Sequence, residues 1–337
     1  MEPKKVQEST GPQIRKTGST IGLSDRWDHF VARWGIRRER HRVEPGLYSL
    51  GEPTSDSPVL VTANYTLSFD ALRAALAGHD CYILVLDTQG INVWCAAGKG
   101  TFGTDELVHR IEAEGLHGIV THRVLILPQL GAPGVAAHEV RRRSGFTVQY
   151  GPVRAAGLPE YLRTHQATPE MRRVSFPLWD RLVLIPVELV HVLLPMAVAG
   201  AGMFLLGGLL VSLGVVSAIL TGVILFPILL PWLPTPNFAT KGAVLGAAAA
   251  LPFALAATFG HPEWAWWMRL GWGAIALLGL APITAFLALN FTGSTPFTSR
   301  SGVRTEIFTY IPKMAVTFGS GLCMALVLSL VRLVGGS

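Results

Sequence analysis

Cysteine and charge are both scarce in this sequence of 337 residues. Its three cysteines, Cys81, Cys95 and Cys323, are too few for a disulfide framework or for an iron–sulfur cluster, which normally takes four thiolates. Charged residues make up 15% of the chain and become rarer still after Arg181, whereas hydrophobic residues make up 50%. The sequence therefore predicts two parts of different kind with a boundary near residue 181, the second of them in a membrane.

The N-terminal segment lacks both hydrophobic periodicity and an apolar run. Residues 1–22 are polar, which predicts a disordered tail, and a cleaved signal peptide is not expected. Residues 23–181 are accordingly predicted to form a cytoplasmic domain. The net charge of +6 comes from Lys and Arg residues scattered among acids, a pattern that argues against nucleic acid and favours a basic face beside anionic lipid.

Short apolar strands alternate with helical patterns in the first part of the chain. Strands are predicted at residues 59–62, 82–87, 123–127 and 147–150. Helices are predicted at residues 68–77, with Ser68 as the N-cap, and at residues 104–114 and 135–143. This alternation is typical of a Rossmann-like α/β domain with a mainly parallel sheet, whose ligand site is expected at the carboxyl ends of the strands.

The second part, residues 182–337, predicts an all-α transmembrane domain of about five helices. The stretch from 182 to 233 is almost wholly apolar and long enough for two spans of about 20 residues each. Further spans fit residues 239–259, 266–289 and 310–330. The positions of Lys241, Arg304 and Lys313 favour one cytoplasmic side, so the chain is predicted to be a multi-pass protein of the cytoplasmic (inner) membrane.

The stretch that carries chemistry follows the strand ending near Asp87. Residues 92–99 read Asn-Val-Trp-Cys-Ala-Ala-Gly-Lys, and the small residues among them let a large flat ligand approach the backbone. If Cys95 lies at the start of a short helix, the exposed amide groups and Lys99 favour its thiolate, the form that ligates metals. Other interpretations stay open on these residues alone: a small buried cysteine, and a Gly/Ala-rich turn that is only a tight βα connection or binds phosphate.

Residues 43–48, 58–65 and 92–99 resemble the HgcA family, the corrinoid proteins of microbial mercury methylation. More distantly they resemble the corrinoid-binding domain of the corrinoid iron–sulfur protein of the acetyl-CoA pathway. The resemblance continues through residues 131–134, 150–154 and 290–299, with the run at 92–99 as its most specific part. The Asp-x-His-x-x-Gly signature of corrinoid proteins that use a histidine ligand is absent, which agrees with a cysteine ligand.

The resemblance implies a corrinoid-dependent methyltransferase that binds cobalamin or a related corrinoid. It implies Cys95 as the catalytic residue and lower axial ligand of the cobalt. A methyl group from a folate-type donor would be held as methyl-Co(III) and pass to Hg(II), giving methylmercury. Because the chain encodes no cluster, the resemblance also implies a ferredoxin-like partner with two [4Fe-4S] clusters as electron donor.

The residues expected to contact the corrinoid lie at strand ends, around Cys95 and in later loops. They are Thr62, Asn64, Thr66, Asn92, Val93, Trp94, Cys95, Ala96, Ala97, Gly98, Lys99, Gly131, Gly134 and Tyr150. Cys323 is expected to pack within the last apolar span.

Two other functions compete with mercury methylation. The first is a membrane-anchored corrinoid methyl carrier that passes the methyl group to another acceptor in one-carbon metabolism. It stays open because nothing in the sequence itself indicates mercury. The second is a membrane transporter or sensor with a nucleotide-binding α/β domain, in which Cys95 is structural. Corrinoid absorption by the purified protein separates the second alternative from the other two hypotheses.

Overall fold

The computed structural model describes residues 14–37, 40–295 and 300–335, which divide into two compact units. Unit 1 runs to Ala32 and continues over Ile36–Val174; unit 2 takes Arg33–Gly35 and the residues from Ser175 onward. The predicted boundary near residue 181 lies inside helix α9, Leu178–Leu182, which belongs to unit 2.

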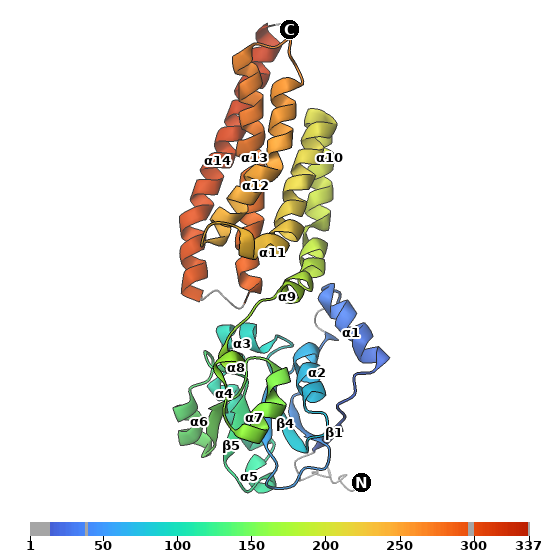
Figure 1. Ribbon diagram of the computed structural model, residues 1–337, viewed down its shortest axis with the longest axis vertical. Helices are drawn as coiled ribbons and strands as arrows, with labels where there is room; N and C mark the ends of the chain where they lie inside the picture. Colours follow the sequence, from blue (N-terminus) through green and yellow to red (C-terminus); the bar gives the residue numbers. More distant parts are fainter. Residues whose placement is uncertain (1–13, 38–39, 296–299, 336–337) are drawn as a thin grey trace, which may run out of the picture. The chain divides into compact units, whose positions relative to one another are not determined.

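Unit 1 is built on a mixed sheet with the strand order β1-β2-β4-β3-β5-β6 (Figure 1). The strands are β1 Arg15–Thr17, β2 Gly46–Leu50, β3 Val59–Ala63, β4 Cys81–Leu86, β5 Val124–Leu127 and β6 Thr147–Tyr150. Strand β3 pairs in parallel with β4 and β5, and β5 with β6, while β2 runs antiparallel to β4. The predicted mainly parallel α/β domain is confirmed as a mixed α/β sheet.

Apart from the first, which buries only Ala32, the helices of unit 1 lie on both faces of this sheet. They are α1 Leu23–Arg33, α2 Thr66–Ala75, α3 Val93–Lys99, α4 Thr104–Ala113, α5 Leu116–Ile119, η2 Gln129–Gly131, α6 Ala137–Ser144, η3 Ala155–Gly157, α7 Leu158–Thr164 and α8 Pro169–Arg172. Because strand side chains alternate, Val61 and Leu84 pack in one core with α3, α4 and α6, whereas Leu60 and Ile83 pack in the other with α2 and α7.

The polar N-terminal segment is ordered from Ile14, so the prediction of disorder through residue 22 is wrong for residues 14–22. Strand β1 pairs in parallel with β2, and the buried Arg73 donates hydrogen bonds of 2.7 Å to the carbonyl oxygens of Gly18 and Thr20. A partner distant in sequence therefore orders a segment that has no hydrophobic pattern of its own. Residues 1–13 lie outside the described residues.

Helix α2 begins at Thr66, two residues before the predicted N-cap Ser68. Tyr65 is the N-cap residue, and its side chain makes no capping hydrogen bond. The amide of Thr66 donates instead to the carbonyl oxygen of His41 at 3.2 Å. A backbone group from elsewhere in the chain thus replaces the local side-chain cap that the sequence predicted.

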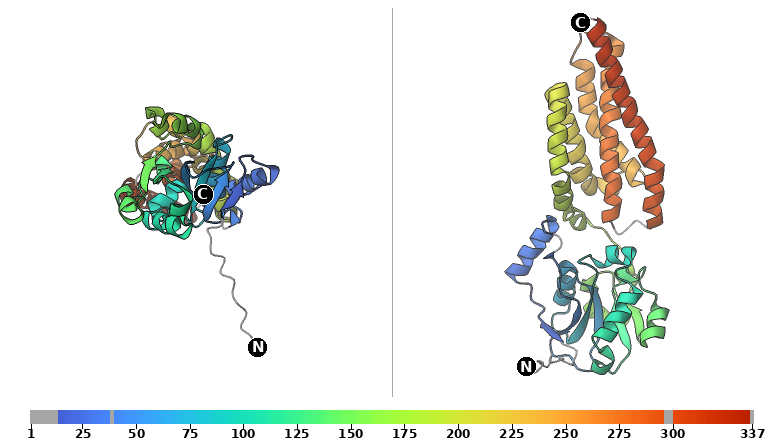
Figure 2. Two further views of the ribbon diagram at one scale, coloured as in Figure 1. Left: turned by 90° about the horizontal axis from the view of Figure 1, so that it is seen from below. Right: turned by 180° about the vertical axis from the view of Figure 1, so that it is seen from behind.

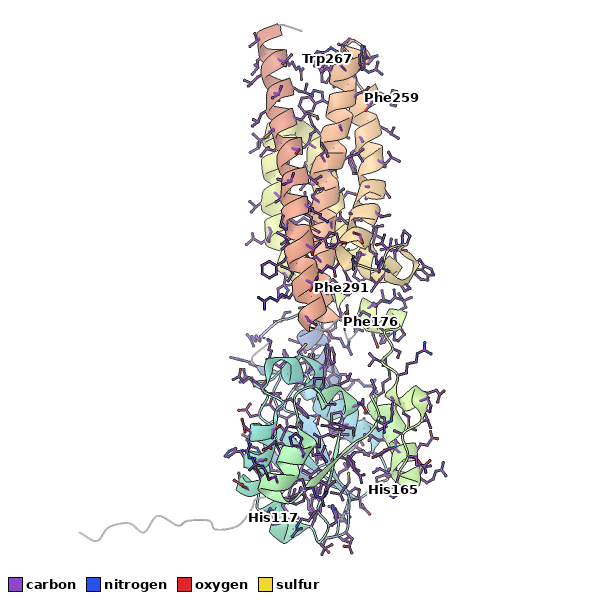
Figure 3. All side chains as sticks on the ribbon, turned by 90° about the vertical axis from the view of Figure 1, so that its left-hand side faces the viewer. His117, His165, Phe176, Phe259, Trp267 and Phe291 are labelled. Atoms are coloured by element: carbon purple, nitrogen blue, oxygen red, sulfur yellow. The ribbon has the colours of Figure 1, made fainter. Side chains whose placement is uncertain are left out.

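The described part of unit 2 consists of helices joined by short loops. Its further elements are α10 Ile185–Leu220, the π-helical turn η4 Thr221–Leu225, α11 Phe226–Leu229, η5 Leu230–Trp232, α12 Phe238–Phe259, α13 Trp266–Asn290, η6 Phe291–Ser294 and α14 Arg300–Gly335. Among the described residues, four helical stretches are long and apolar enough to cross a membrane: Leu178–Trp232, Phe238–Phe259, Trp266–Gly293 and Ser301–Val334. Phe259 and Trp267 lie at one end of this unit, and Phe291 lies at the other (Figure 3).

The first of these stretches folds back on itself at Gly208 (Figures 1 and 2). Gly208 has φ 76° and ψ −171°, outside helical values. The Ser212 hydroxyl donates to the Gly200 carbonyl oxygen at 2.7 Å, so the segments on either side of Gly208 lie together as two arms. The two spans predicted between 182 and 233 correspond to these arms, and with α12, α13 and α14 they make up the predicted set of about five segments. That these segments cross a membrane stays a prediction.

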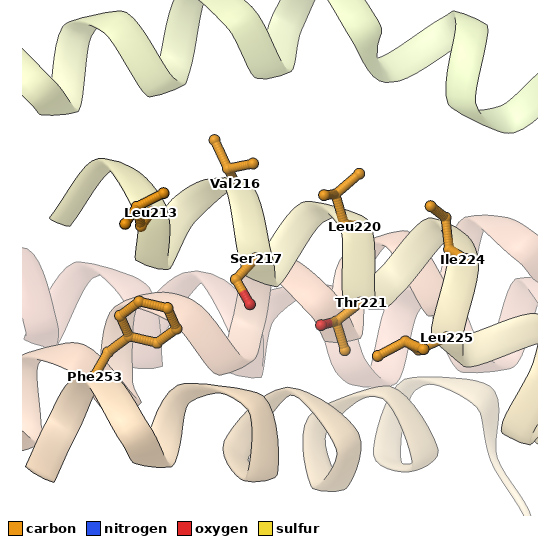
Figure 4. Close-up of a pocket in the computed structure, with 8 residues that line it drawn as sticks. All are labelled: Leu213, Val216, Ser217, Leu220, Thr221, Ile224, Leu225 and Phe253. Atoms are coloured by element: carbon orange, nitrogen blue, oxygen red, sulfur yellow. The ribbon is translucent and has the colours of Figure 1, made fainter. Parts of the chain in front are cut away.

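Helix α12 packs closely against α13 and also borders a groove along the second arm. A Cβ on Gly246 of α12 would lie 2.7 Å from the Thr284 Cβ of α13, so the glycine lets the two helices approach closely. A groove of about 530 Å³ runs along the second arm to Phe253 of α12 and is lined mainly by apolar side chains, with the hydroxyls of Ser217 and Thr221 among them (Figure 4). Such a lining is expected of a surface that meets lipid tails.

Candidate functional site

The loop between β4 and α3 is held by the side chain of Asn64, which directly follows β3. The Asn64 Oδ1 atom accepts hydrogen bonds from the amides of Thr88 at 3.0 Å and Gly90 at 2.9 Å, and lies 2.9 Å from the Thr88 hydroxyl. Its Nδ2 atom donates to Asp87 Oδ1 at 3.1 Å. Because Asn64 is only 2% exposed, its polar atoms are committed to this loop. Asn64 is therefore a positioning residue for the segment that leads to Cys95.

The same loop contains two consecutive residues with left-handed backbone conformation, Gln89 (φ 59°) and Gly90 (φ 71°). A Cβ on Gly90 would lie 2.7 Å from Arg42 Cγ, so this position requires glycine. The amide of Asp87 donates to Glu106 Oε1 of α4 at 2.8 Å. The loop is consequently fixed by hydrogen bonds to both β3 and α4.

Helix α3 places Cys95 in its first turn. Asn92 is the N-cap, and its side-chain oxygen accepts a hydrogen bond from the Cys95 amide at 2.9 Å. The helix ends after Lys99 at Gly100, whose φ of 91° is the left-handed value typical of a helix C-terminus. The prediction that Cys95 lies near the start of a short helix is confirmed.

The run 92–99 divides between two faces of α3. Val93, Ala96 and Ala97 are buried in the core, so their side chains pack against the protein. The remaining residues, Asn92, Trp94, Cys95, Gly98 and Lys99, are partly or fully exposed. Helical periodicity turns the side chains of both alanines inward, and contact of this run with a corrinoid stays a prediction.

Gly98 is the residue that leaves room on the open face. A Cβ built on it would meet no atom within 4 Å. Since residues three apart lie on the same side of a helix, Gly98 and Cys95 share this face. The thiol is thus partly exposed beside an uncovered stretch of backbone.

Gly131 and Gly134 pack against the protein itself. A Cβ on Gly131 would lie 2.5 Å from Phe102 Cε1, and one on Gly134 would lie 2.9 Å from the Ala97 Cα atom. Phe102 is fully buried, and sequence reasoning did not single it out, although a large aromatic residue between glycines is a signal of such packing. Because these glycines have no side chains, the 131–134 loop packs closely against Phe102 and α3.

Tyr150 joins β6 to the same loop. Its hydroxyl donates to the carbonyl oxygen of Val135 at 2.8 Å, and burial raises the pKa of this phenol. Thr62 is 3% exposed and shares a strand face with Leu60, toward α2 and α7, whereas Thr66 opens α2. The structure therefore assigns Tyr150 a supporting contact, and ligand contact by Thr62 and Thr66 stays a prediction.

The other two cysteines lie in different surroundings. Cys81 is buried at the start of β4, and burial raises the pKa of its thiol to about 12, so the thiol stays protonated at neutral pH. Cys323 is exposed on the apolar helix α14, so the expectation that it packs inside the last span is wrong, because its side of the helix faces away from the neighbouring helices. No group of three or more His, Cys, Asp and Glu side chains among the described residues could hold a metal ion.

Unit 1 shows sequence similarity to subunits of enzymes of acetyl-CoA metabolism. The model of a family described as CO dehydrogenase/acetyl-CoA synthase delta subunit matches residues 37–162. The acetyl-CoA decarbonylase/synthase complex subunit gamma of Methanopyrus kandleri is 38% identical over 127 residues, which are 37% of this chain and 27% of that protein. The subunit gamma of Methanothermobacter thermautotrophicus is 33% identical over 127 residues, again 37% of this chain and 27% of the relative.

A third relative, the subunit gamma of Methanocaldococcus jannaschii, is 31% identical over 130 residues, or 38% of this chain and 26% of that protein. The chain thus spans about a quarter of the length of the curated relatives it matches. The family match lies within unit 1 and includes Cys95 with the loops that hold it, so this part of the chain is similar to the family described as CO dehydrogenase/acetyl-CoA synthase delta subunit.

Proposed function

We propose that unit 1 is a corrinoid-binding methyl carrier in which the Cys95 thiolate would ligate the cobalt of the bound corrinoid. The observation that carries this proposal is the partly exposed thiol of Cys95 on the open face of α3, at the carboxyl edge of the sheet. The similarity of unit 1 to acetyl-CoA decarbonylase/synthase subunits supports a role in one-carbon chemistry.

The residues present fit a corrinoid. A corrin ring supplies its own equatorial nitrogen ligands to cobalt, so the protein needs to add a single donor atom, and Cys95 offers one. Gly98, on the same helix face, has no atom within 4 Å of the position that a Cβ would take, which leaves space for a flat ring. By contrast, Cys81 is unsuited to metal ligation because its buried thiol stays protonated.

The bound corrinoid would supply a cobalt centre that takes up and releases a methyl group. The chain's own residues position the sulfur that faces this centre. Asn92 caps the turn that contains Cys95, and Asn64 holds the preceding loop through Thr88 and Gly90. A thiolate is a soft, electron-rich ligand, so its position determines how strongly it donates electron density to the metal.

Within this proposal, Hg(II) is the methyl acceptor and methylmercury the product. The residues of the 92–99 run support this choice through their resemblance to the corrinoid proteins of mercury methylation. A folate-type donor would provide the methyl group, and a ferredoxin-like partner with two [4Fe-4S] clusters would provide electrons. The apolar helices of unit 2 would anchor the protein in the cytoplasmic membrane with unit 1 in the cytoplasm.

A corrinoid carrier with another acceptor is the second candidate. The relatives are subunits of complexes named for acetyl-CoA decarbonylation and synthesis, which favours an acceptor in one-carbon metabolism. Formation of methylmercury by cells that express the chain with its electron donor separates the two candidates. Methyl transfer to a different acceptor without methylmercury would favour the second.

The ligation itself is tested by the visible absorption spectrum of the purified full-length chain reconstituted with a corrinoid. Cys95→Ala is expected to remove the thiolate-ligated form and to abolish methyl transfer, whereas Cys323→Ala, on an exposed face of α14, should preserve both. An unchanged spectrum and full activity in Cys95→Ala would contradict the ligand assignment. Failure of the unaltered chain to take up any corrinoid would favour the transporter or sensor hypothesis.

A further inference from the structure

Helix α1 exposes its apolar face instead of burying it. Leu23, Trp27 and Phe30 follow one another at spacings of four and three residues, so they lie on one side of the helix, and they are 84%, 67% and 49% exposed. The rings of Trp27 and Phe30 stack with their centroids 5.5 Å apart. A surface helix of a soluble domain normally turns such a face toward the core, so this orientation requires another apolar environment.

The opposite, polar face of α1 is attached to unit 1 by an ion pair and a hydrogen bond. Asp25 pairs with Arg73, and His29 pairs with Asp70, each at 2.7 Å. Arg73 and Asp70 are 8% and 3% exposed. Arg73 and Asp70 also pair with each other at 2.6 Å. Rotating the helix to bury its apolar face would remove the additional contacts that Asp25 and His29 make with this buried pair of α2.

A third contact joins α1 to His41, in the segment that follows the helix. Asp28 lies 2.7 Å from the Nδ1 atom of the buried His41, whose Nε2 atom lies 2.8 Å from the carbonyl oxygen of Ile36. Contacts of Asp25, Asp28 and His29 therefore hold α1 in one orientation. These contacts on the polar face fix the direction in which Leu23, Trp27 and Phe30 point.

Positive charge accompanies the apolar face. Arg26 lies within α1, and Arg37 and Arg40 follow it; all three side chains are exposed. The acidic residues of the helix, Asp25 and Asp28, are on the attached face. The exposed side of α1 thus combines Leu23, Trp27 and Phe30 with Arg26, and two more exposed arginines follow in the chain. Apolar side chains accompanied by arginines are the composition of helices that lie in an anionic lipid interface.

The chain that follows α1 is tied to the first apolar helix. Arg33–Gly35 group with unit 2, and within that unit a Cβ on Gly35 would lie 2.8 Å from Val187 Cγ2, near the start of α10. The end of α1 is therefore connected within two residues to the segment at which the apolar part of the chain begins.

We infer that α1 is an interfacial helix that lies on an anionic membrane surface with Leu23, Trp27 and Phe30 in the headgroup region. This inference rests on the proposal that unit 2 spans a membrane. Lipid is the occupant that fits both the apolar residues and the exposed arginines. The contact would give unit 1 a second attachment to the membrane, additional to its covalent link to unit 2, and would restrict the directions in which Cys95 can face.

Spin labels in the full-length protein test the inference in nanodiscs of phosphatidylcholine, with and without phosphatidylglycerol. One label is placed at Leu23→Cys and a matched aqueous control at Glu112→Cys, an exposed position of α4, both in a Cys95→Ser, Cys323→Ser background. Native Cys323 in a Cys95→Ser background is the membrane control, because it is exposed on α14. Accessibility to oxygen reports lipid, and accessibility to a nickel chelate reports water.

The oxygen-to-nickel accessibility ratio at position 23 is expected to be several-fold higher than at position 112 and to approach that at Cys323. Arg26→Glu should lower the ratio at position 23 in the anionic discs and leave it unchanged in the zwitterionic discs. Equal ratios at positions 23 and 112 would overturn the inference, and so would shielding of position 23 from both reagents, which indicates a protein partner. A water-like ratio at Cys323 would instead contradict the membrane assignment of unit 2.

Discussion

Replacing Asn64 with alanine is expected to open the loop that positions Cys95. The substitution removes the acceptor of two amides, those of Thr88 and Gly90, which now donate at 3.0 and 2.9 Å. An unsatisfied buried donor costs about 1–3 kcal/mol, so two of them predict a loss of local stability of about 3 kcal/mol. Because about 1.4 kcal/mol corresponds to a factor of ten, the open population of the loop should rise about 100-fold.

Hydrogen exchange of the full-length protein, read by mass spectrometry, measures this opening directly. In Asn64→Ala, peptides that cover residues 87–92 should exchange about 100-fold faster, while those of β5 and β6 keep their wild-type rates. The matched control is Asn92→Ala, which loses only the helix cap at about 1 kcal/mol, so the Cys95 amide should exchange about fivefold faster and the Thr88 and Gly90 amides should not change. Wild-type exchange of the loop in Asn64→Ala would refute the reasoning, as would equal opening of the loop in Asn92→Ala.

The remaining predictions concern the packing of α3 and the reactivity of the thiols. Gly134→Ala places a methyl group 2.9 Å from Ala97 Cα and should lower the melting temperature of the protein, whereas Gly98→Ala has open space and should melt as wild type but bind a corrinoid more weakly in an equilibrium titration. Unchanged binding by Gly98→Ala would contradict the assignment of the open face. Since burial raises the pKa of Cys81 to about 12, alkylation of the native protein at about pH 8 should modify Cys95 and spare Cys81 until the protein is denatured, as mass spectrometry would show. Equal modification of both cysteines in the native protein would refute the protonated, inaccessible state of Cys81.

The strands and the apolar helices could be predicted because their patterns are local. The predicted strands at 59–62 and 147–150 correspond to β3, Val59–Ala63, and β6, Thr147–Tyr150. Parallel strands covered by helices on both faces appear as short continuous apolar runs, and β3 and β4 are buried along their whole length. The long apolar stretches of unit 2 are equally visible, since length and hydropathy alone define them.

Segments whose order depends on distant partners could not be predicted. Residues 14–22 have no hydrophobic pattern, yet β1 pairs with β2 and Arg73 binds the carbonyl oxygens of Gly18 and Thr20. For the same reason, α2 begins earlier than the predicted N-cap at Ser68, because the Thr66 amide donates its hydrogen bond to the carbonyl oxygen of His41. The outward apolar face of α1 is also invisible to periodicity, which shows that a helix is amphipathic but not which side is attached.

For the candidate site, the sequence by itself determined that Cys95 closely follows a strand and lies in a run of small residues, because these features are adjacent in the chain. That Asn92 caps a short helix with Cys95 in its first turn, ending at Gly100, is what the structure adds. Only the tertiary structure decided which small residues face outward and what holds them. Asn64 reaches Thr88 across 24 positions because β3 and β4 are neighbours, and Gly134 meets Ala97 because the later loop folds beneath α3. Contacts of this kind arise from strand order and packing, which no local pattern of residues encodes.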